Sequence, residues 1–122
     1  VEQGEGERGE DPGEDVVVEH TANPFGITVR RAGSEKAMFS TESFSLIYKE
    51  DFLEVSTSLG PDDVLYGIGE RTRSGGLTVP RDGQREALWA RDMGAMNPDK
   101  NLYGSHPFYM QLSAEDHKAH GV

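Results

Sequence analysis

The stretch Phe25-Gly-Ile-Thr-Val-Arg-Arg31 decides the fold class, because apolar and polar residues alternate along it. Alternation with a period of two places Phe25, Ile27 and Val29 on one face of a β-strand and the polar residues between them on the other. The β-branched run in Val16–His20 predicts a neighbouring strand across a proline-containing turn. No window of the chain shows a helical period of useful length, so the pattern predicts an all-β fold.

The rest of the chain repeats this pattern of short strands and polar turns. The further strands predicted are 36–40, 44–49, 52–58, 64–69, 86–90, 105–113 and 118–122. A long polar loop, 70–84, and a second loop, 91–100, separate the later ones, and loops as long as the first tend to be functional or mobile. Turns spaced at about 8–12 residues favour an antiparallel β-sandwich. Because the last strand stops at Val122, we expect a sandwich that is incomplete at its C-terminal end.

The formal net charge of −10 is distributed unevenly. Seven acidic residues and one arginine lie in residues 1–15, which are also rich in glycine. Such a segment buries too little apolar area to order itself, so we expect an acidic disordered leader over 1–15 and the structured domain over 16–122. A basic partner for the leader is the alternative. Nucleic acid is disfavoured as a partner, because no basic patch is present.

The composition excludes a membrane-spanning helix and every site that depends on cysteine. No apolar run approaches the ~20 residues that a membrane-spanning helix requires. The chain has no cysteine, which excludes disulfides, thiol catalysis and thiolate metal sites within it.

The strongest local candidate for a binding site is Trp89 with Arg91 and Asp92, on a loop rich in Gly, Met and Pro. Sugars are bound by an aromatic platform beneath the apolar face of the ring and by a carboxylate that accepts hydroxyl hydrogens. Asp92 can accept from two donors, and Arg91 can orient it. The alternative is that Trp89 belongs to the core and Arg91–Asp92 is a surface ion pair of little energetic value.

Glycoside hydrolysis requires two facing carboxyl groups, ~5 Å apart for retention of configuration. Glu70, Asp82, Glu86 and Asp92 are available. Nothing in their spacing forces any two of them together, so we expect no catalytic residue in this chain.

The histidines offer no better site. His117 and His120 follow Asp116, but across a predicted turn their imidazoles would not converge on a metal. His106, beside a proline, is either a packed histidine or the acid/base of a sugar epimerase. We expect neither a metal nor a cofactor.

Several motifs, taken in order, resemble the N-terminal domain of glycoside hydrolase family 31, the α-glucosidases. They are Asn23–Arg31, Phe52-Leu-x-Val-Ser-Thr-Ser58, Leu65-Tyr-Gly-Ile-Gly-Glu70, Leu88-Trp-Ala-Arg-Asp92, Asn101-Leu-Tyr-Gly-Ser-His-Pro-Phe-Tyr-Met110 and Ala119-His-Gly-Val122. The resemblance covers residues 16 to 122. The loop Arg71–Gln84 and the acidic leader match no pattern of the family.

The resemblance implies a galactose-mutarotase-like β-sandwich packed on a catalytic (β/α)8 barrel that carries both catalytic aspartates. By the same resemblance, Asp92 would hydrogen-bond sugar hydroxyls, Arg91 and Met93 would shape the pocket, and Trp89 would anchor the loop. The implied substrate is an α-glucoside of the maltose or starch type, cleaved with retention.

The Tyr-Gly-Ser-His-Pro-Phe-Tyr motif, 103–109, is similar to that of secreted, vacuolar or lysosomal members of the family. The alternative is a stand-alone carbohydrate-binding β-sandwich with no enzymatic partner.

Overall fold

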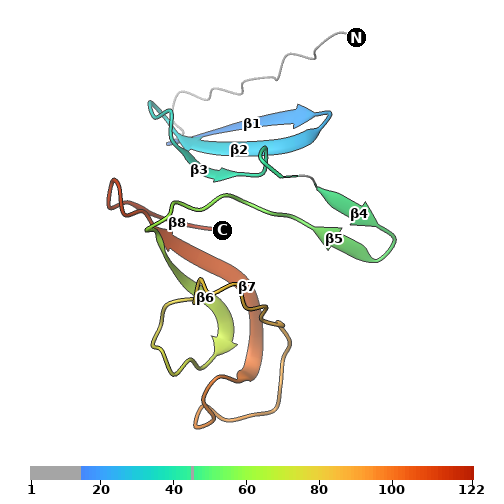
Figure 1. Ribbon diagram of the computed structural model, residues 1–122, viewed down its shortest axis with the longest axis vertical. Coiled ribbons are helices and arrows are strands. Elements are labelled where there is room, and N and C mark those ends of the chain that lie inside the picture. The colour runs from blue at the N-terminus through green and yellow to red at the C-terminus, as the bar shows by residue number, and fades with distance from the viewer. Residues whose placement is uncertain (1–14, 45) are drawn as a thin grey trace. The chain divides into compact units, whose positions relative to one another are not determined.

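The computed structural model describes residues 15–44 and 46–122, and the chain divides into two compact units, Val1–Leu59 and Gly60–Val122. The strands of the first unit are β1 (Val16–Ala22), β2 (Phe25–Arg31), β3 (Ala37–Ser40), β4 (Ile47–Lys49) and β5 (Phe52–Glu54). Those of the second are β6 (Val64–Arg71), β7 (Asn101–Leu112) and β8 (Ala119–Gly121) (Figure 1). Every described element is a strand and every pairing is antiparallel, which confirms the predicted fold class.

The first sheet has the order β1-β2-β3 and is built around the alternating stretch. Val18 lies opposite Val29, and the ladder closes at a two-residue turn between Ala22 and Phe25. Thr28 is 2% exposed, and its hydroxyl lies 3.0 Å from the Ser40 hydroxyl on β3. Thr28, on the polar face of β2, is therefore satisfied by a side-chain hydrogen bond across the strands.

Of the leader predicted for residues 1–15, only Asp15 lies within the described residues. Its carbonyl oxygen accepts a hydrogen bond of 3.0 Å from the Ala32 amide, which extends the β1–β2 ladder by one bond. The other residues of the predicted leader lie outside the described part of the chain.

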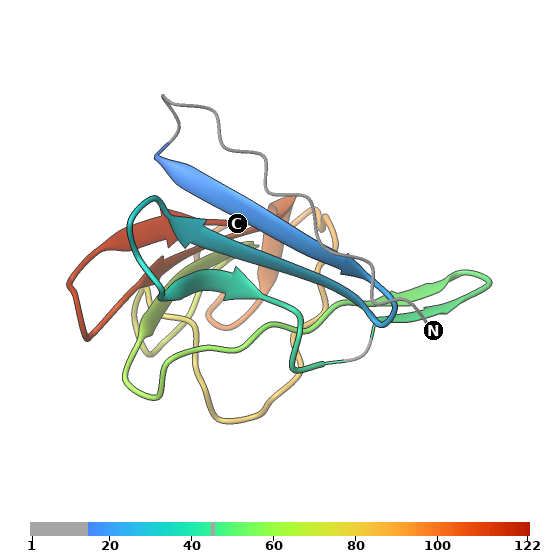
Figure 2. The same ribbon diagram turned by 90° about the horizontal axis from the view of Figure 1, so that it is seen from above.

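The β4–β5 hairpin is shorter than predicted, since three residues pair on each side rather than the runs 44–49 and 52–58. Its two strands and turn form the green hairpin in Figure 2. The turn contains Glu50 at φ 49°, and all six strand residues are exposed. Beyond β5 the chain makes side-chain and backbone contacts with β3 instead of a ladder, as in the Ser58 amide donating to the Ser40 carbonyl at 3.4 Å. β5 itself ends at Glu54.

The sheet of the second unit has the order β6-β7-β8, and its first two strands are longer than predicted. β7 begins at Asn101 rather than 105, and β6 reaches Arg71. The register shifts near Gly67, where φ is 109° and an added Cβ would lie 2.5 Å from the Phe108 carbonyl oxygen. Only glycine fits this bulge, which explains a glycine in the interior of a strand.

The strand predicted over 86–90 is wrong. These residues have no regular secondary structure and lie within the long connection between β6 and β7. Thr78 of that connection forms an isolated bridge with Tyr66, but the segment around Trp89 has no ladder partner. Its backbone is held by isolated hydrogen bonds instead, such as that from Asn101 Nδ2 to the Ala87 carbonyl at 2.7 Å.

Among the described residues no apolar side chain is buried, and the buried side chains are polar. They are Thr28, Thr41, Asp63, Asn101, Gln111 and Ser113. The alternating apolar faces line a partly open cavity in the first unit, with a volume of about 150 Å³ between Phe25, Phe39, Phe44, Leu46 and Val55. Polar networks therefore specify much of the local geometry in this span.

Asp63 is the most connected of these buried residues. Its Oδ2 accepts from Gln111 Nε2 at 2.6 Å and from the Gly60 amide at 3.2 Å, while Oδ1 accepts from the Ala114 amide at 3.0 Å. The carboxylate thus links the entry of β6 to the end of β7 and the turn that follows.

The described residues contain no helix that is long and apolar enough to cross a membrane.

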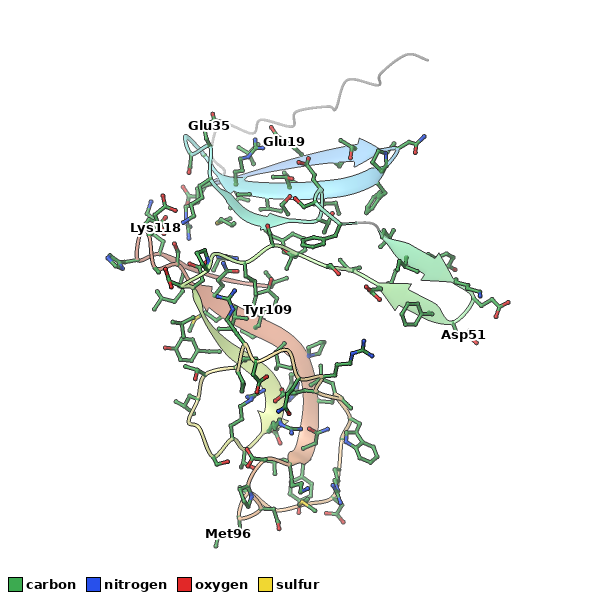
Figure 3. The ribbon with its side chains drawn as sticks, in the orientation of Figure 1. Glu19, Glu35, Asp51, Met96, Tyr109 and Lys118 are labelled. Atoms are coloured by element: carbon green, nitrogen blue, oxygen red, sulfur yellow. The ribbon has the colours of Figure 1, made fainter. Side chains whose placement is uncertain are left out.

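Tyr109, on β7 (Figure 3), should make stability fall at alkaline pH. Burial raises the pKa of its phenol above the ordinary value of 10.0. The unfolded chain therefore ionises first, and the free energy of unfolding falls as the pH rises past 10. We expect Tyr109→Phe to reduce this fall in urea titrations between about pH 8 and 11. Tyr48→Phe, at a 76% exposed position of β4, is the control. Equal alkaline slopes for Tyr109→Phe and the unaltered chain would contradict the assignment.

Candidate functional site

The residues predicted to bind substrate lie on the connection from Thr72 to Lys100, between β6 and β7. Trp89 is 59% exposed, so it is not a core residue within the described part of the chain. The Arg91 guanidinium lies 5.9 Å from the centre of the indole ring. A cation at that distance is attracted to the ring face, so Arg91 and Trp89 form one unit.

Asp92 and Met93 follow in an open part of the loop. Asp92 is exposed and Met93 is half-buried. The backbone turns tightly here, because the Met93 amide donates to the Arg91 carbonyl at 2.8 Å. Beyond it the connection runs to Met96, which is 95% exposed at the tip of the loop (Figure 3). The four predicted residues thus lie on one short segment in which Arg91 contacts Trp89 and Asp92 is exposed.

The base of this segment is attached to the start of β7 by two hydrogen bonds. Asn101 Nδ2 donates to the Ala87 carbonyl at 2.7 Å, and the Arg91 amide donates to the Leu102 carbonyl at 2.6 Å. Residues 88–90, which include Trp89, lie between the two attachments.

A second polar network lies beside the first and contains Arg71, the last residue of β6, and Arg73, two residues beyond it. Glu86 forms ion pairs with Arg73 at 2.7 Å and with Arg71 at 3.3 Å. Arg71 also donates to Asn101 Oδ1 at 2.8 Å. Glu86, Arg71 and Asn101 therefore connect the strand ends to the loop.

Asp99 fastens the far end of the same connection. Its carboxylate accepts hydrogen bonds from the Ser74 hydroxyl and, at 3.0 Å, from the Ser74 amide. These bonds, first that of the hydroxyl and then that of the amide, lower the pKa of Asp99 below its ordinary value of 3.8. The two ends of the loop 74–99 are joined by this contact.

The Asp99 contact should be lost in acid. Since the folded-state pKa is depressed, the stabilisation is present above pH 3.8 and disappears as the pH falls through the lower folded-state value. We expect Asp99→Asn to lower the urea midpoint at about pH 7, and the difference from the unaltered chain to shrink as the pH falls below 3.8. Asp51→Asn, in the exposed β4–β5 turn (Figure 3), should show no such convergence. A difference that persists unchanged at pH 2 would refute the role of the carboxylate.

The other acidic candidates have local structural partners. Glu70 Oε2 accepts from the Gly104 amide at 2.9 Å, and Asp82 Oδ1 accepts from the Gln84 amide at 3.0 Å. Glu86 is engaged by two arginines. Of these four acids, all within the described residues, Asp92 is the one without a hydrogen bond or ion pair, although Glu70 and Asp82 are exposed as well.

The histidines lie apart from this segment in chain position. His106 is exposed on β7, paired opposite Gly69, so it is not the packed histidine that was one of its two interpretations. His117 occupies the β7–β8 turn at φ 55°, and His120 is on β8. Within residues 15–44 and 46–122, no three His, Asp or Glu side chains gather as a metal site requires.

Sequence reasoning missed the part played by Arg71, Arg73 and Asn101. One signal was available: two arginines at i and i+2 beyond a glycine-rich strand share one face if the strand continues. Because residues 70–84 were predicted to form a loop, no shared face was expected for the two arginines.

Residues 1–122 match the family described as Glycosyl hydrolase 31 N-terminal galactose mutarotase-like domain. Alpha-xylosidase 1 of Arabidopsis thaliana is 38% identical over 109 residues, which are 88% of this chain and 12% of that protein. Alpha-glucosidase of Hordeum vulgare is 40% identical over 111 residues, or 90% of this chain and 12% of the relative. Lysosomal alpha-glucosidase of Bos taurus is 39% identical over 105 residues, 86% of this chain and 11% of its own length.

The chain therefore spans no more than 12% of the length of these relatives. The match extends over the whole chain and agrees with the antiparallel strands, so the galactose-mutarotase-like β-sandwich predicted from the sequence is confirmed. The chain belongs to glycoside hydrolase family 31, as its N-terminal galactose mutarotase-like domain.

Proposed function

We propose that this chain is the N-terminal β-sandwich of a larger α-glucosidase and supplies a substrate-contacting loop to a catalytic (β/α)8 barrel. Residues 16–122 would form the sandwich domain, preceded by the acidic leader. The observation that carries the proposal is the exposed Trp89–Met93 segment, held at its base by polar contacts in a member of family 31. The family match supports the class of the parent protein, and the exposure of this segment supports a substrate-contacting role within it.

The chemistry of the segment suits binding rather than bond cleavage. The indole of Trp89 offers an apolar platform, Arg91 lies against it, and Asp92 can accept two hydroxyl hydrogens. Retaining hydrolysis additionally needs a nucleophile and an acid/base on opposite sides of the glycosidic bond, about 5–5.5 Å apart. Since Glu70, Asp82 and Glu86 are engaged locally, we assign that pair to the barrel.

The names of the relatives include both alpha-glucosidase and alpha-xylosidase. The two sugars share an α-linked pyranose ring and differ by the hydroxymethyl group at C5. A hydrogen-bonding carboxylate such as Asp92 would serve either ring, so the choice between them depends on the rest of the pocket. We propose terminal α-linked glucose of maltose- and starch-type oligosaccharides as the substrate.

The full-length protein should release α-glucose first from maltose, as seen by NMR of the anomeric proton before mutarotation. Comparison with an α-xyloside gives the ratio of the two kcat/KM values and so fixes the preferred sugar. The 122-residue chain alone should hydrolyse neither substrate. Release of the β-anomer, or hydrolysis by the chain alone, would refute the proposal.

A stand-alone carbohydrate-binding module is the second candidate, favoured by the exposure of Trp89. Because Trp89 is the one tryptophan of the chain, a sugar stacked on it would change the intrinsic fluorescence of the 122-residue protein directly. Saturable quenching by millimolar maltose, with no activity in the full-length protein, would favour this candidate.

A further inference from the structure

We infer that Glu86 is the positioning residue for the Trp89–Met93 segment, and that it acts by binding two arginines with one carboxylate. This inference rests on the proposed function for its effect on catalysis. Its structural part, the order of the segment itself, does not.

Glu86 is a bridge between two cations. Its Oε2 lies 2.7 Å from Arg73 Nη2 and its Oε1 lies 3.3 Å from Arg71 Nε. The side chains of Arg73, Arg71 and Glu86 are only 7%, 22% and 21% exposed. Ion pairs at this depth are screened far less than surface pairs, and loss of one partner leaves an uncompensated charge.

Both arginines are themselves fixed to the sheet. Arg73 donates to the carbonyls of Gly67 and Ile68 at 3.2 and 3.1 Å, on the bulge of β6. Arg71 donates to Asn101 Oδ1 at 2.8 Å and to the Asp99 carbonyl at 3.1 Å. The carboxylate is therefore tied to the end of β6 and to the start of β7 at once.

The position of Glu86 in the chain transmits this constraint to the binding segment. The next residue, Ala87, accepts the hydrogen bond from Asn101 Nδ2, and Arg91 is attached to Leu102 four residues later. Trp89 projects between these two attachments and is 59% exposed, so side-chain burial does not hold it. The orientation of the segment thus depends on the polar base beneath it.

Neutralising Glu86 would remove the negative charge that Arg71 and Arg73 share at the base of the segment. An amide in its place offers one acceptor oxygen and an NH2 group that faces guanidinium donors. Arg71 and Arg73 would then repel each other without a shared anion. We expect the segment to detach from β7 while the rest of the sheet stays intact.

The first test uses the 122-residue chain. Because Trp89 is its one tryptophan, time-resolved fluorescence anisotropy reports the motion of the segment itself. We expect Glu86→Gln to increase the amplitude of nanosecond Trp89 motion about twofold and Glu86→Asp, which keeps the charge, to restore most of the order. Glu54→Gln, an exposed glutamate of β5, is the matched control. Unchanged anisotropy in Glu86→Gln would overturn the inference.

The second test uses the full-length enzyme. Misplacement of a substrate-contacting group should lower kcat/KM about tenfold, mainly through KM, with partial recovery in Glu86→Asp. In the Asp92→Ala background, Glu86→Gln should have little further effect, because both act on the same contact. Fully additive effects would show a merely structural role and overturn the inference.

Two outcomes separate this inference from the proposed function. If Glu86→Gln increases the motion of Trp89 but Asp92→Ala leaves kcat/KM unaltered, the positioning role of Glu86 stands and the proposed function fails. If Glu86→Gln does not fold, Asn101→Asp replaces it, since that change substitutes a carboxylate oxygen, which repels the Ala87 carbonyl, for the donor and keeps the acceptor for Arg71. Unchanged Trp89 motion in Asn101→Asp would then contradict the inference that this polar base orders the segment.

Discussion

Asp63→Ala should be among the most destabilising single substitutions in this chain, costing about 3 kcal/mol of the free energy of unfolding. The buried carboxylate accepts from Gln111 Nε2 and from the amides of Gly60 and Ala114. Alanine leaves these donors without the acceptor that they share, and hydrogen bonds to a charged group are each worth about 1.5–3 kcal/mol. Among the described residues no buried apolar side chain could compensate.

Urea unfolding of the 122-residue chain, followed by far-ultraviolet circular dichroism, measures this loss. Asp62→Ala is the matched control, since Asp62 is the exposed neighbour in the same turn and should change stability by less than about 0.5 kcal/mol. Asp63→Asn should fall between the two, because it keeps one acceptor but sets an NH2 group against a donor. Equal midpoints for Asp63→Ala and Asp62→Ala would show that the network contributes nothing.

Asp92→Ala in the full-length enzyme should reduce kcat/KM for maltose by about 5- to 150-fold, equivalent to ~1–3 kcal/mol of lost transition-state stabilisation. The carboxylate is exposed in this chain and stands on the segment that carries Trp89 and Arg91. Sugar hydroxyls that donate hydrogen bonds to this carboxylate would lose their acceptor. Thermal unfolding should barely change, because an exposed side chain contributes little to stability.

The control for this experiment is Asp51→Ala, which removes an exposed carboxylate from the β4–β5 turn. It should leave kcat/KM within the error of the unaltered enzyme. A kcat/KM for Asp92→Ala that matches Asp51→Ala would remove Asp92 from the substrate site.

Strand alternation predicted the fold class correctly because each antiparallel strand records its two faces in a period of two. Phe25–Arg31 became β2 at the predicted boundaries, and its neighbours paired as expected. The same rule failed over 86–90, where an apolar run that looks like a strand is held by Asn101 and Glu86 instead. Long-range polar contacts of this kind leave no periodic trace in sequence.

The candidate site was found from residue types and family resemblance, whereas its support was not. Trp89, Arg91 and Asp92 are conspicuous because an exposed aromatic beside charges is unusual for a loop. Glu86 looked like one loop acid among several, since only the fold places it between Arg71 and Arg73. The residue types of the candidate site can be read from the local sequence, whereas the contacts that position them depend on the tertiary structure.

The most direct measurement of the central claim is a crystal structure of the full-length protein with an α-glucosidase inhibitor bound at the non-reducing-end glucose site. We predict that the carboxylate oxygens of Asp92 lie within about 3.2 Å of hydroxyls of that sugar, with the Trp89–Met93 segment at the rim of the barrel. A sugar seated in the barrel with Asp92 facing bulk solvent would contradict the account.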